Sequence, residues 1–217
     1  MTCGAVDIRG NTDDRFRHGH LYLLKNIIFR KEYPMKTLLA AAACAMMALT
    51  GAAWAHGPVR LKLELEQKLN ATPDEVWSTI GKFDDMSWHP AVASTEITGD
   101  GSVDQPEKSV RVLHLKADAG DPTITETLTK WQPEKRCYGY MISAVEVSVL
   151  PVTNYASTLC VKDDGGKAVV SWKGGFYRGF PNNNPPADQN DDAAMAGVTG
   201  VYQAGLDALA EKFGKAE

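Results

Sequence analysis

The chain lacks most of the patterns that mark well-known catalytic and metal sites. It has 4 cysteines, and no cysteine–histidine grouping has the spacing of a zinc site. A glycine-rich phosphate loop, a nucleophile elbow and an internal repeat are also absent. The sequence therefore argues against a phosphate-loop enzyme, an α/β-hydrolase and a repeat protein. We expect neither a metal nor a cofactor.

Long apolar runs are scarce as well. The longest, from about Thr37 to Ala48, is shorter than the roughly 20 residues that a membrane helix needs. It lies within residues 35–55, which begin with a basic stretch and end on an A-x-A site, Ala53-Trp54-Ala55. This is the layout of a cleaved secretory signal peptide. We therefore expect no membrane span in the mature protein and a location in the periplasm.

Residues 1–34 show no sustained period, and we interpret them as an upstream extension that does not fold. Cleavage after Ala55 leaves residues 56–217, a length that suits a single domain with its own core. His56 would then be N-terminal, where its amine and imidazole could chelate copper with a second histidine. Only His89 and His114 remain as partners, and no spacing supports either.

Basic residues are outnumbered in this expected mature domain. The whole chain carries 23 Lys and Arg and 27 Asp and Glu, of which residues 1–55 hold 7 and 4. Residues 56–217 therefore hold 16 and 23, a net charge of −7. An acidic surface argues against nucleic acid or anionic lipid as a partner. It suits a basic protein partner, or solubility alone.

Periodicity predicts an α+β fold in which a curved antiparallel sheet wraps around a long C-terminal helix. A short helix is expected over 71–83, because Thr72, Pro73 and Glu75 form a capping-box pattern. The strands are expected at 60–70, 93–98, 109–116, 123–131, 137–147, 152–162 and 167–178.

The helix expected over 191–213 is the element that the sheet would enclose. Asn190 or Asp191 can cap its start, and Gly214 follows its last turn. Its apolar stripe consists of Val198, Tyr202, Leu206, Leu209 and Phe213. The helix also contains Gly197, Gly200 and Gly205, which indicate either tight packing against the sheet or room for a ligand.

Several stretches together resemble the SRPBCC superfamily, also called START-like or helix-grip proteins, which includes the polyketide cyclase/dehydrase-like proteins. They are ATPDEVWSTIGKFDDMSWHP near the start, TITETL at 123–128, LPVTNYASTLCV at 150–161 and VVSWKGGF at 169–176. HGP at the expected mature start and WHP after the first helix make the chain most similar to the MxaD-like proteins of periplasmic methanol oxidation.

The resemblance implies a cavity between sheet and helix, and it implies that three residues of this chain line that cavity. TITETL matches a stretch whose glutamate lines the pocket of plant hormone receptors, which implies a pocket role for Glu126, although Thr127 replaces the usual arginine. TNYAS implies the same for Tyr155 and Ser157. Residues 117–122 match the receptors' gating loop in position but lack its motif, so gated signalling is not expected.

Strand alternation extends this set of candidate cavity residues. With Glu126, they are Tyr138, Tyr140, Tyr155, Ser157, Leu159, Trp172, Phe176, Val198 and Tyr202. Two interpretations remain open, because these side chains could instead fill an ordinary core and Glu126 could face outward. Trp88 and His89 are candidates for the pocket rim or a partner contact, although His89 could equally be a hydrogen-bonded loop histidine.

The favoured function is a small-molecule-binding or accessory protein without catalytic residues, taking a hydrophobic or amphipathic ligand. The MxaD-like resemblance implies help to a methanol dehydrogenase system, with the dehydrogenase or a cytochrome c as partner. A cyclase- or dehydratase-like enzyme using Glu126, Tyr155 and a histidine is the alternative, as is a carrier of a hydrophobic ligand.

The pairing of Cys137 and Cys160 stays open at this level. They are the two cysteines of the expected mature domain, and an even number in an oxidising compartment allows a disulfide. A regular hairpin would place them opposite each other on the outer face. A one-residue bulge near Leu150-Pro151 would instead separate the two sulfur atoms. A disulfide and two separate thiols are therefore both compatible with the sequence.

Overall fold

A computed structural model describes residues 57–99 and 103–216 of the chain. The expected upstream extension, the expected signal peptide and His56 lie outside the described residues. Within them, seven strands form one antiparallel sheet in the order β1-β7-β6-β5-β4-β3-β2. The strands are β1 (Leu61–Leu69), β2 (Val92–Gly99), β3 (Ser109–Leu115), β4 (Thr123–Gln132), β5 (Cys137–Val145), β6 (Val152–Asp164) and β7 (Lys167–Arg178).

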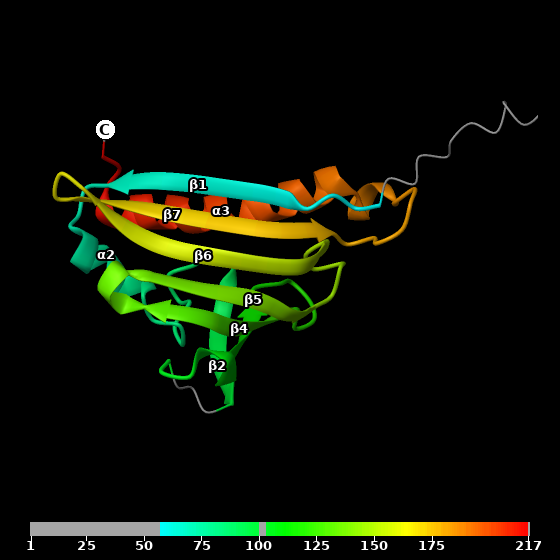
Figure 1. Cartoon of the computed structure of the whole chain (residues 1–217), viewed down its shortest axis with the longest axis horizontal. Helices are drawn as coiled ribbons and strands as arrows, with labels where there is room; N and C mark the ends of the chain where they lie inside the picture. The colour runs from blue at the N-terminus through cyan, green and yellow to red at the C-terminus, as the bar shows by residue number, and fades with distance from the viewer. Residues whose placement is uncertain (1–56, 100–102, 217) are drawn as a thin grey trace, which may run out of the picture. The chain divides into compact units, whose positions relative to one another are not determined.

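The long helix α3 (Asp191–Phe213) runs along the sheet behind β1 and β7 (Figure 1). Its start is capped by Asn190, whose side-chain oxygen accepts a hydrogen bond from the Ala193 N–H at 2.8 Å. It ends at Phe213, and the C-cap residue Gly214 has a φ of 79°, which favours glycine. The Gly214 carbonyl then accepts a hydrogen bond from the Asn70 N–H, at 2.8 Å, which fixes the helix end beside β1.

The short helix α2 (Pro73–Ile80) forms where the capping box predicts it. The Thr72 hydroxyl accepts from the Glu75 N–H, and the Glu75 carboxylate accepts from the Thr72 N–H. The helix ends at Ile80 rather than at Phe83: the C-cap Gly81 makes the last helical bond, to the Trp77 carbonyl, and the chain then turns. Three short 3-10 turns complete the structure: Pro106–Lys108, Pro133–Lys135 and Ala187–Gln189.

The predicted α+β helix-grip arrangement is confirmed. The sheet buries one face against α3, and the stripe residues Val198, Tyr202, Leu206 and Leu209 are at most 1% exposed. None of the helices within 57–99 and 103–216 has the length and apolarity needed to cross a membrane.

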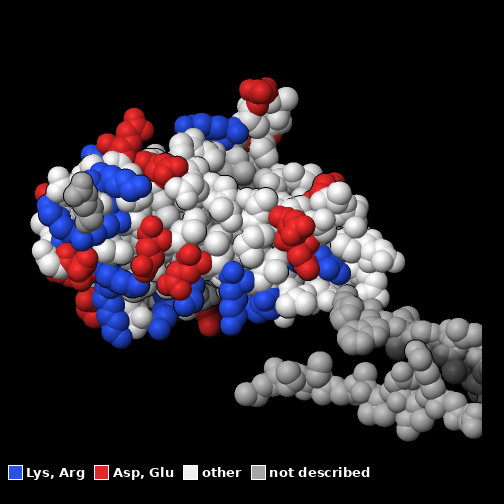
Figure 2. Space-filling view, turned by 90° about the horizontal axis from the view of Figure 1, so that it is seen from above, with Lys and Arg blue, Asp and Glu red and all other residues white. Residues whose placement is uncertain are grey.

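The outer surface carries charges of both signs. On β1, β6 and β7, exposed ion pairs join Glu64 to Lys173 and Glu66 to Lys162. The face seen from above has lysine and arginine interspersed with aspartate and glutamate (Figure 2). That face therefore offers no broad area of a single charge to a partner.

Two of the three α3 glycines mark close packing, and the third does not. A Cβ atom at Gly205 would lie 2.8 Å from both His89 Cδ2 and Trp172 Cζ3, and one at Gly197 would lie 3.2 Å from Leu150 Cδ1. A Cβ atom at Gly200 would meet nothing within 4 Å. The tight-packing interpretation therefore holds for Gly197 and Gly205.

The variant Gly205→Ala is expected to lower the free energy of unfolding by about 1–3 kcal/mol, because the added methyl group displaces His89 or Trp172. The matched variant Gly200→Ala adds the same methyl group in open space. It should raise the free energy of unfolding by about 1 kcal/mol through helix propensity alone. Urea denaturation of both variants measures the difference, and equal effects at the two positions would refute the packing argument.

Cys137 and Cys160 form a disulfide. The register pairs the two residues directly across β5 and β6, with their Cα atoms 4.2 Å apart. Pairing between these strands is regular from Cys137 to Met141. The irregularity expected near Pro151 falls instead between Thr153 and Ala156, in the pairing of β6 with β7. The bulge thus leaves the cysteine register undisturbed.

Candidate functional site

A buried cavity lies between the concave face of the sheet and α3. Its volume is about 80 Å³. Most of its walls are apolar, as is usual for a small-molecule site. The lining side chains are Met86, His89, Ala91, Val92, Leu113, Leu115, Ile124, Glu126, Tyr140, Ile142, Val149, Leu150, Tyr155, Trp172, Val198 and Val201.

The charged group in this wall is Glu126, and Arg111 holds it in place. The two residues are opposite each other on β4 and β3. Arg111 Nε and one terminal nitrogen donate to Glu126 Oε2 at 2.7 and 2.6 Å. The other terminal nitrogen donates to the Phe83 carbonyl at 2.9 Å, and the guanidinium lies 4.3 Å from the Phe83 ring centroid. Both side chains are almost fully buried.

Burial raises the pKa of Glu126, and the charge and hydrogen bonds of Arg111 oppose that rise. Arginine keeps its proton in proteins, so a neutral Glu126 would leave an uncompensated buried cation. The ionised form of Glu126 is therefore the one that matches its surroundings. Arg111 donates only to Oε2, and Oε1 accepts no hydrogen bond from the described residues.

A row of hydroxyl groups crosses the site beside this ion pair. Trp172 Nε1 donates to the Tyr140 oxygen at 2.9 Å, and the oxygens of Tyr140 and Tyr155 are 3.5 Å apart. The Tyr155 and Tyr202 oxygens are 2.7 Å apart, and Tyr202 lies 2.8 Å from Ser157 Oγ. Ser157 donates to the Lys173 carbonyl at 2.9 Å.

The two ends of this row fix the direction of its hydrogen bonds. An indole N–H can only donate and a carbonyl can only accept. Ser157 gives its proton to the carbonyl, so Tyr202 must donate to Ser157 and Tyr155 must donate to Tyr202. The Tyr140 proton is left with the 3.5 Å contact to Tyr155, which is long for a bond between hydroxyl groups.

His89 lines the cavity, and both of its ring nitrogens are engaged. Nδ1 accepts from the Ala91 N–H at 3.2 Å, so Nε2 carries the proton and donates to the Val201 carbonyl on α3 at 3.0 Å. Burial lowers the pKa of His89. The residue is thus at once a hydrogen-bonded loop histidine and part of the wall.

The candidate residues named from the sequence fall into two groups. Those that line the cavity are Glu126, Tyr140, Tyr155, Trp172, Val198 and His89. Those buried around it without lining it are Tyr138, Ser157, Leu159, Phe176 and Tyr202. Trp88 lies beside a separate surface groove with Lys82 and Lys212. A role in ligand binding stays a prediction for all of them.

Sequence reasoning missed Arg111 and most of the aliphatic wall. Arg111 shares strand parity with Leu113, which would have placed both on the inner face. The flanking residues Val110 and Val112 obscured this signal, because they make the outer face of β3 equally apolar. The resemblance pointed to an arginine beside Glu126 in the sequence, whereas the structure supplies one from the neighbouring strand.

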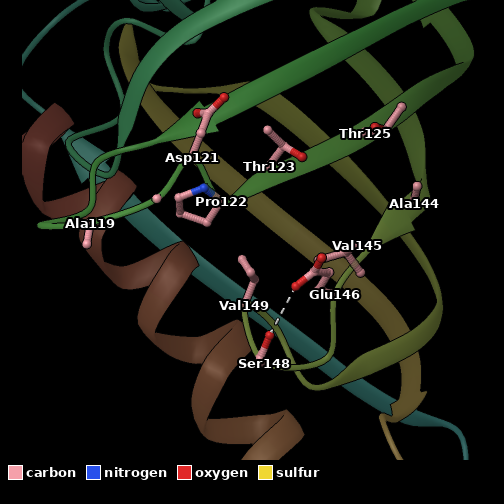
Figure 3. Close-up of a pocket in the computed structure, with 11 residues that line it drawn as sticks. Ala119, Asp121, Pro122, Thr123, Thr125, Ala144, Val145, Glu146, Ser148 and Val149 are labelled. Carbon is pink, nitrogen blue, oxygen red and sulfur yellow. Dashed lines mark hydrogen bonds between the residues drawn. The ribbon is translucent and has the colours of Figure 1, made fainter.

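An open cleft of about 610 Å³ lies outside the cavity (Figure 3). Figure 3 shows Asp121 and Pro122 on one side of it and Glu146 and Val149 on the other. Val149 lines both the cleft and the cavity, so its side chain stands between the two spaces. The loop at 117–122, which the resemblance compares with the receptors' gating loop, thus borders this cleft.

Solved structures with this arrangement include the protein XoxI from Bacillus cereus, with 29% identity, a TM-score of 0.57 and coverage of 70% of this chain and 94% of that one. A protein from Bacillus thuringiensis has 29% identity, a TM-score of 0.55 and coverage of 71% and 98%. The Zhui aromatase/cyclase from Streptomyces, at 18% identity, a TM-score of 0.55 and coverage of 71% and 93%, shares the fold. No curated protein sequence matches the chain significantly.

The family model described as polyketide cyclase / dehydrase and lipid transport matches residues 60–214. This range contains all seven strands and both described helices. It confirms the resemblance to the SRPBCC superfamily drawn from the sequence. The chain therefore belongs to the polyketide cyclase / dehydrase and lipid transport family.

Proposed function

We propose that the protein binds a small hydrophobic or amphipathic molecule in the cavity between the sheet and α3, and that it does so without chemical turnover. The observation that carries this proposal is a mostly apolar space whose lining includes two polar side chains, Glu126 and Tyr140. Apolar walls with a few fixed polar groups are the usual composition of a site that binds rather than reacts.

The hydrogen-bonding state of the polar groups supports binding over catalysis. A cyclase-like reaction needs a positioned acid and base near the same substrate. His89 has both ring nitrogens engaged, and Glu126 is paired with Arg111. His114 lies outside the cavity wall, with Nδ1 3.0 Å from Asp121. None of the described histidines is therefore free to exchange a proton with a bound molecule.

Binding can be tested with toluene and phenol, two compounds of seven heavy atoms that differ in the presence of a hydroxyl group. Either compound is expected to shift backbone amide NMR signals of cavity residues in the full chain. The variant Val198→Phe should abolish the shifts, because a phenyl group on α3 fills the space. The matched variant Val59→Phe changes a residue that is 63% exposed and should leave them intact.

The proposed function would be refuted if neither compound, added up to its solubility limit, shifted the amide signals of cavity residues. Binding that persists unchanged in Val198→Phe would refute it as well. Thermal unfolding of the two variants completes the comparison, since a folded Val198→Phe protein is required for its loss of binding to count.

The site is proposed to act in the periplasm, as an accessory to a methanol dehydrogenase system with the dehydrogenase or a cytochrome c as partner. The signal-peptide layout of residues 35–55 supports this location, and so does the Cys137–Cys160 disulfide, since such bonds persist in oxidising compartments. N-terminal sequencing of secreted protein is expected to begin at His56. A sequence that begins upstream of Met35 would contradict the proposal.

A further inference from the structure

The cavity contains one hydrogen-bond acceptor and one donor without good partners, and they are neighbours. Glu126 Oε1 accepts no hydrogen bond from the described residues, and the Tyr140 proton has only a 3.5 Å contact. Strand register pairs Glu126 with Ile142 and Leu128 with Tyr140. Glu126 and Tyr140 are therefore diagonal neighbours on the same face of β4 and β5, within reach of one small group.

Arg111 keeps this pair in position. Its guanidinium binds Glu126 Oε2 and lies 5.3 Å from the centroid of the Tyr140 ring. The other carboxylate oxygen is thereby left for the cavity. At the other side of Tyr140, the indole of Trp172 occupies an acceptor site of the phenol oxygen. The orientation of both groups is thus set by protein contacts before any molecule binds.

The geometry points to an uncharged ligand whose single hydroxyl group donates to Glu126 and accepts from Tyr140 while its apolar body fills the rest of the cavity. This assignment rests on the proposed function. A hydroxyl group satisfies both unpartnered groups at once, because it has one proton and two lone pairs. An ether or a hydrocarbon would shield the carboxylate oxygen from water without supplying a donor, which costs free energy.

Ionised ligands are disfavoured by the charge balance of the wall. Arg111 and Glu126 neutralise each other, so a bound carboxylate or ammonium group would give the buried site a net charge. A carboxylate would also face the Glu126 carboxylate directly. The site therefore selects alcohols or phenols over acids and amines of the same size.

The test compares phenol, toluene, benzoate and benzylammonium by isothermal titration calorimetry on the full chain at neutral pH. Phenol is expected to bind about tenfold more tightly than toluene, since one hydrogen bond to a charged acceptor outweighs the loss of phenol hydration. A plain apolar cavity gives the reverse order, because it buries the hydroxyl unpaired. Benzoate and benzylammonium are expected to bind more weakly than toluene.

The variant Tyr140→Phe tests the role of the Tyr140 hydroxyl group as the hydrogen-bond donor to the ligand. It should reduce the preference for phenol over toluene, expressed as the ratio of the two affinities, by about tenfold. Tyr177→Phe removes a hydroxyl group outside the cavity wall and serves as the matched control, with an unchanged preference. Using the ratio of the two affinities corrects for any general loss of stability in either variant.

Toluene binding as tightly as phenol would overturn the assignment and leave the proposed function intact, because an apolar ligand would still occupy the cavity. Tight binding of benzoate or an unchanged preference in Tyr140→Phe would overturn it as well. If neither phenol nor toluene binds, the proposed function fails and the assignment fails with it.

Discussion

Replacing Arg111 with methionine is expected to lower the free energy of unfolding by about 3–5 kcal/mol. The variant leaves the Glu126 carboxylate in a nearly water-free position without its counter-ion, and Arg111 and Glu126 are 1% and 6% exposed. Removing Arg111 lowers the free energy of unfolding by far more than the intact ion pair contributes to it, because water does not reach the Glu126 carboxylate that remains. Urea denaturation at neutral pH measures the change.

The loss should also depend on pH. Without Arg111, only burial acts on the pKa of Glu126, so the carboxyl group holds its proton more strongly in the folded state than in the unfolded state. The folded protein then binds more protons than the unfolded chain above the ordinary pKa of glutamate, about 4.3. Its stability therefore falls as the pH rises from this value until the carboxyl group ionises. The defect should be smaller at pH 5 than at pH 8.

Two further variants separate charge burial from other effects of the mutation. The double variant Arg111→Met/Glu126→Leu removes both charges and should recover most of the lost stability, since apolar groups often replace a buried ion pair at little cost. Lys162→Met breaks the exposed pair with Glu66 and should change stability by about 1 kcal/mol or less. A cost for Arg111→Met no larger than for Lys162→Met would contradict the argument.

Reduction of the Cys137–Cys160 disulfide is expected to lower the free energy of unfolding by about 3 kcal/mol. The bond joins residues separated by 23 positions, and breaking it restores the conformational freedom of that loop to the unfolded chain. Urea denaturation with and without reductant measures the loss. The double variant Cys137→Ser/Cys160→Ser should show the same loss and no response to reductant.

The bond itself can be checked directly. Alkylation of the denatured, unreduced protein followed by peptide mapping should leave Cys137 and Cys160 unlabelled and joined in one peptide pair. Full labelling of both residues would show two free thiols, and a double variant as stable as the unreduced protein would show that the bond contributes no stability.

Local sequence signals determined most of the architecture. Alternation in LKLELEQ predicts a half-buried strand, and the three- and four-residue steps from Val198 to Leu209 predict the buried stripe of α3. The Thr72–Glu75 capping box forms as expected. These features depend on residues within one or two turns of each other, so their physical causes are present in a short stretch of chain.

The polar part of the site depends on register instead. Strand alternation correctly places Tyr138 and Tyr140 on the inner face, yet only Tyr140 lines the cavity. Arg111 meets Glu126 because β3 and β4 pair in one particular alignment, and a shift by one residue would send one of the two outward. No pattern within either strand records that alignment.

The sequence by itself determined the order and type of the elements, the buried stripe of α3 and the inward parity of Tyr140 and Tyr155, whereas it left open the face on which Glu126 lies. Only the tertiary structure decided which inward side chains border empty space, how His89 reaches the Val201 carbonyl across 112 residues, and that Cys137 lies opposite Cys160. The reason is physical. Period and capping are short-range preferences of the backbone, whereas cavities, ion pairs and disulfides depend on contacts that form only when distant segments pack in a single register.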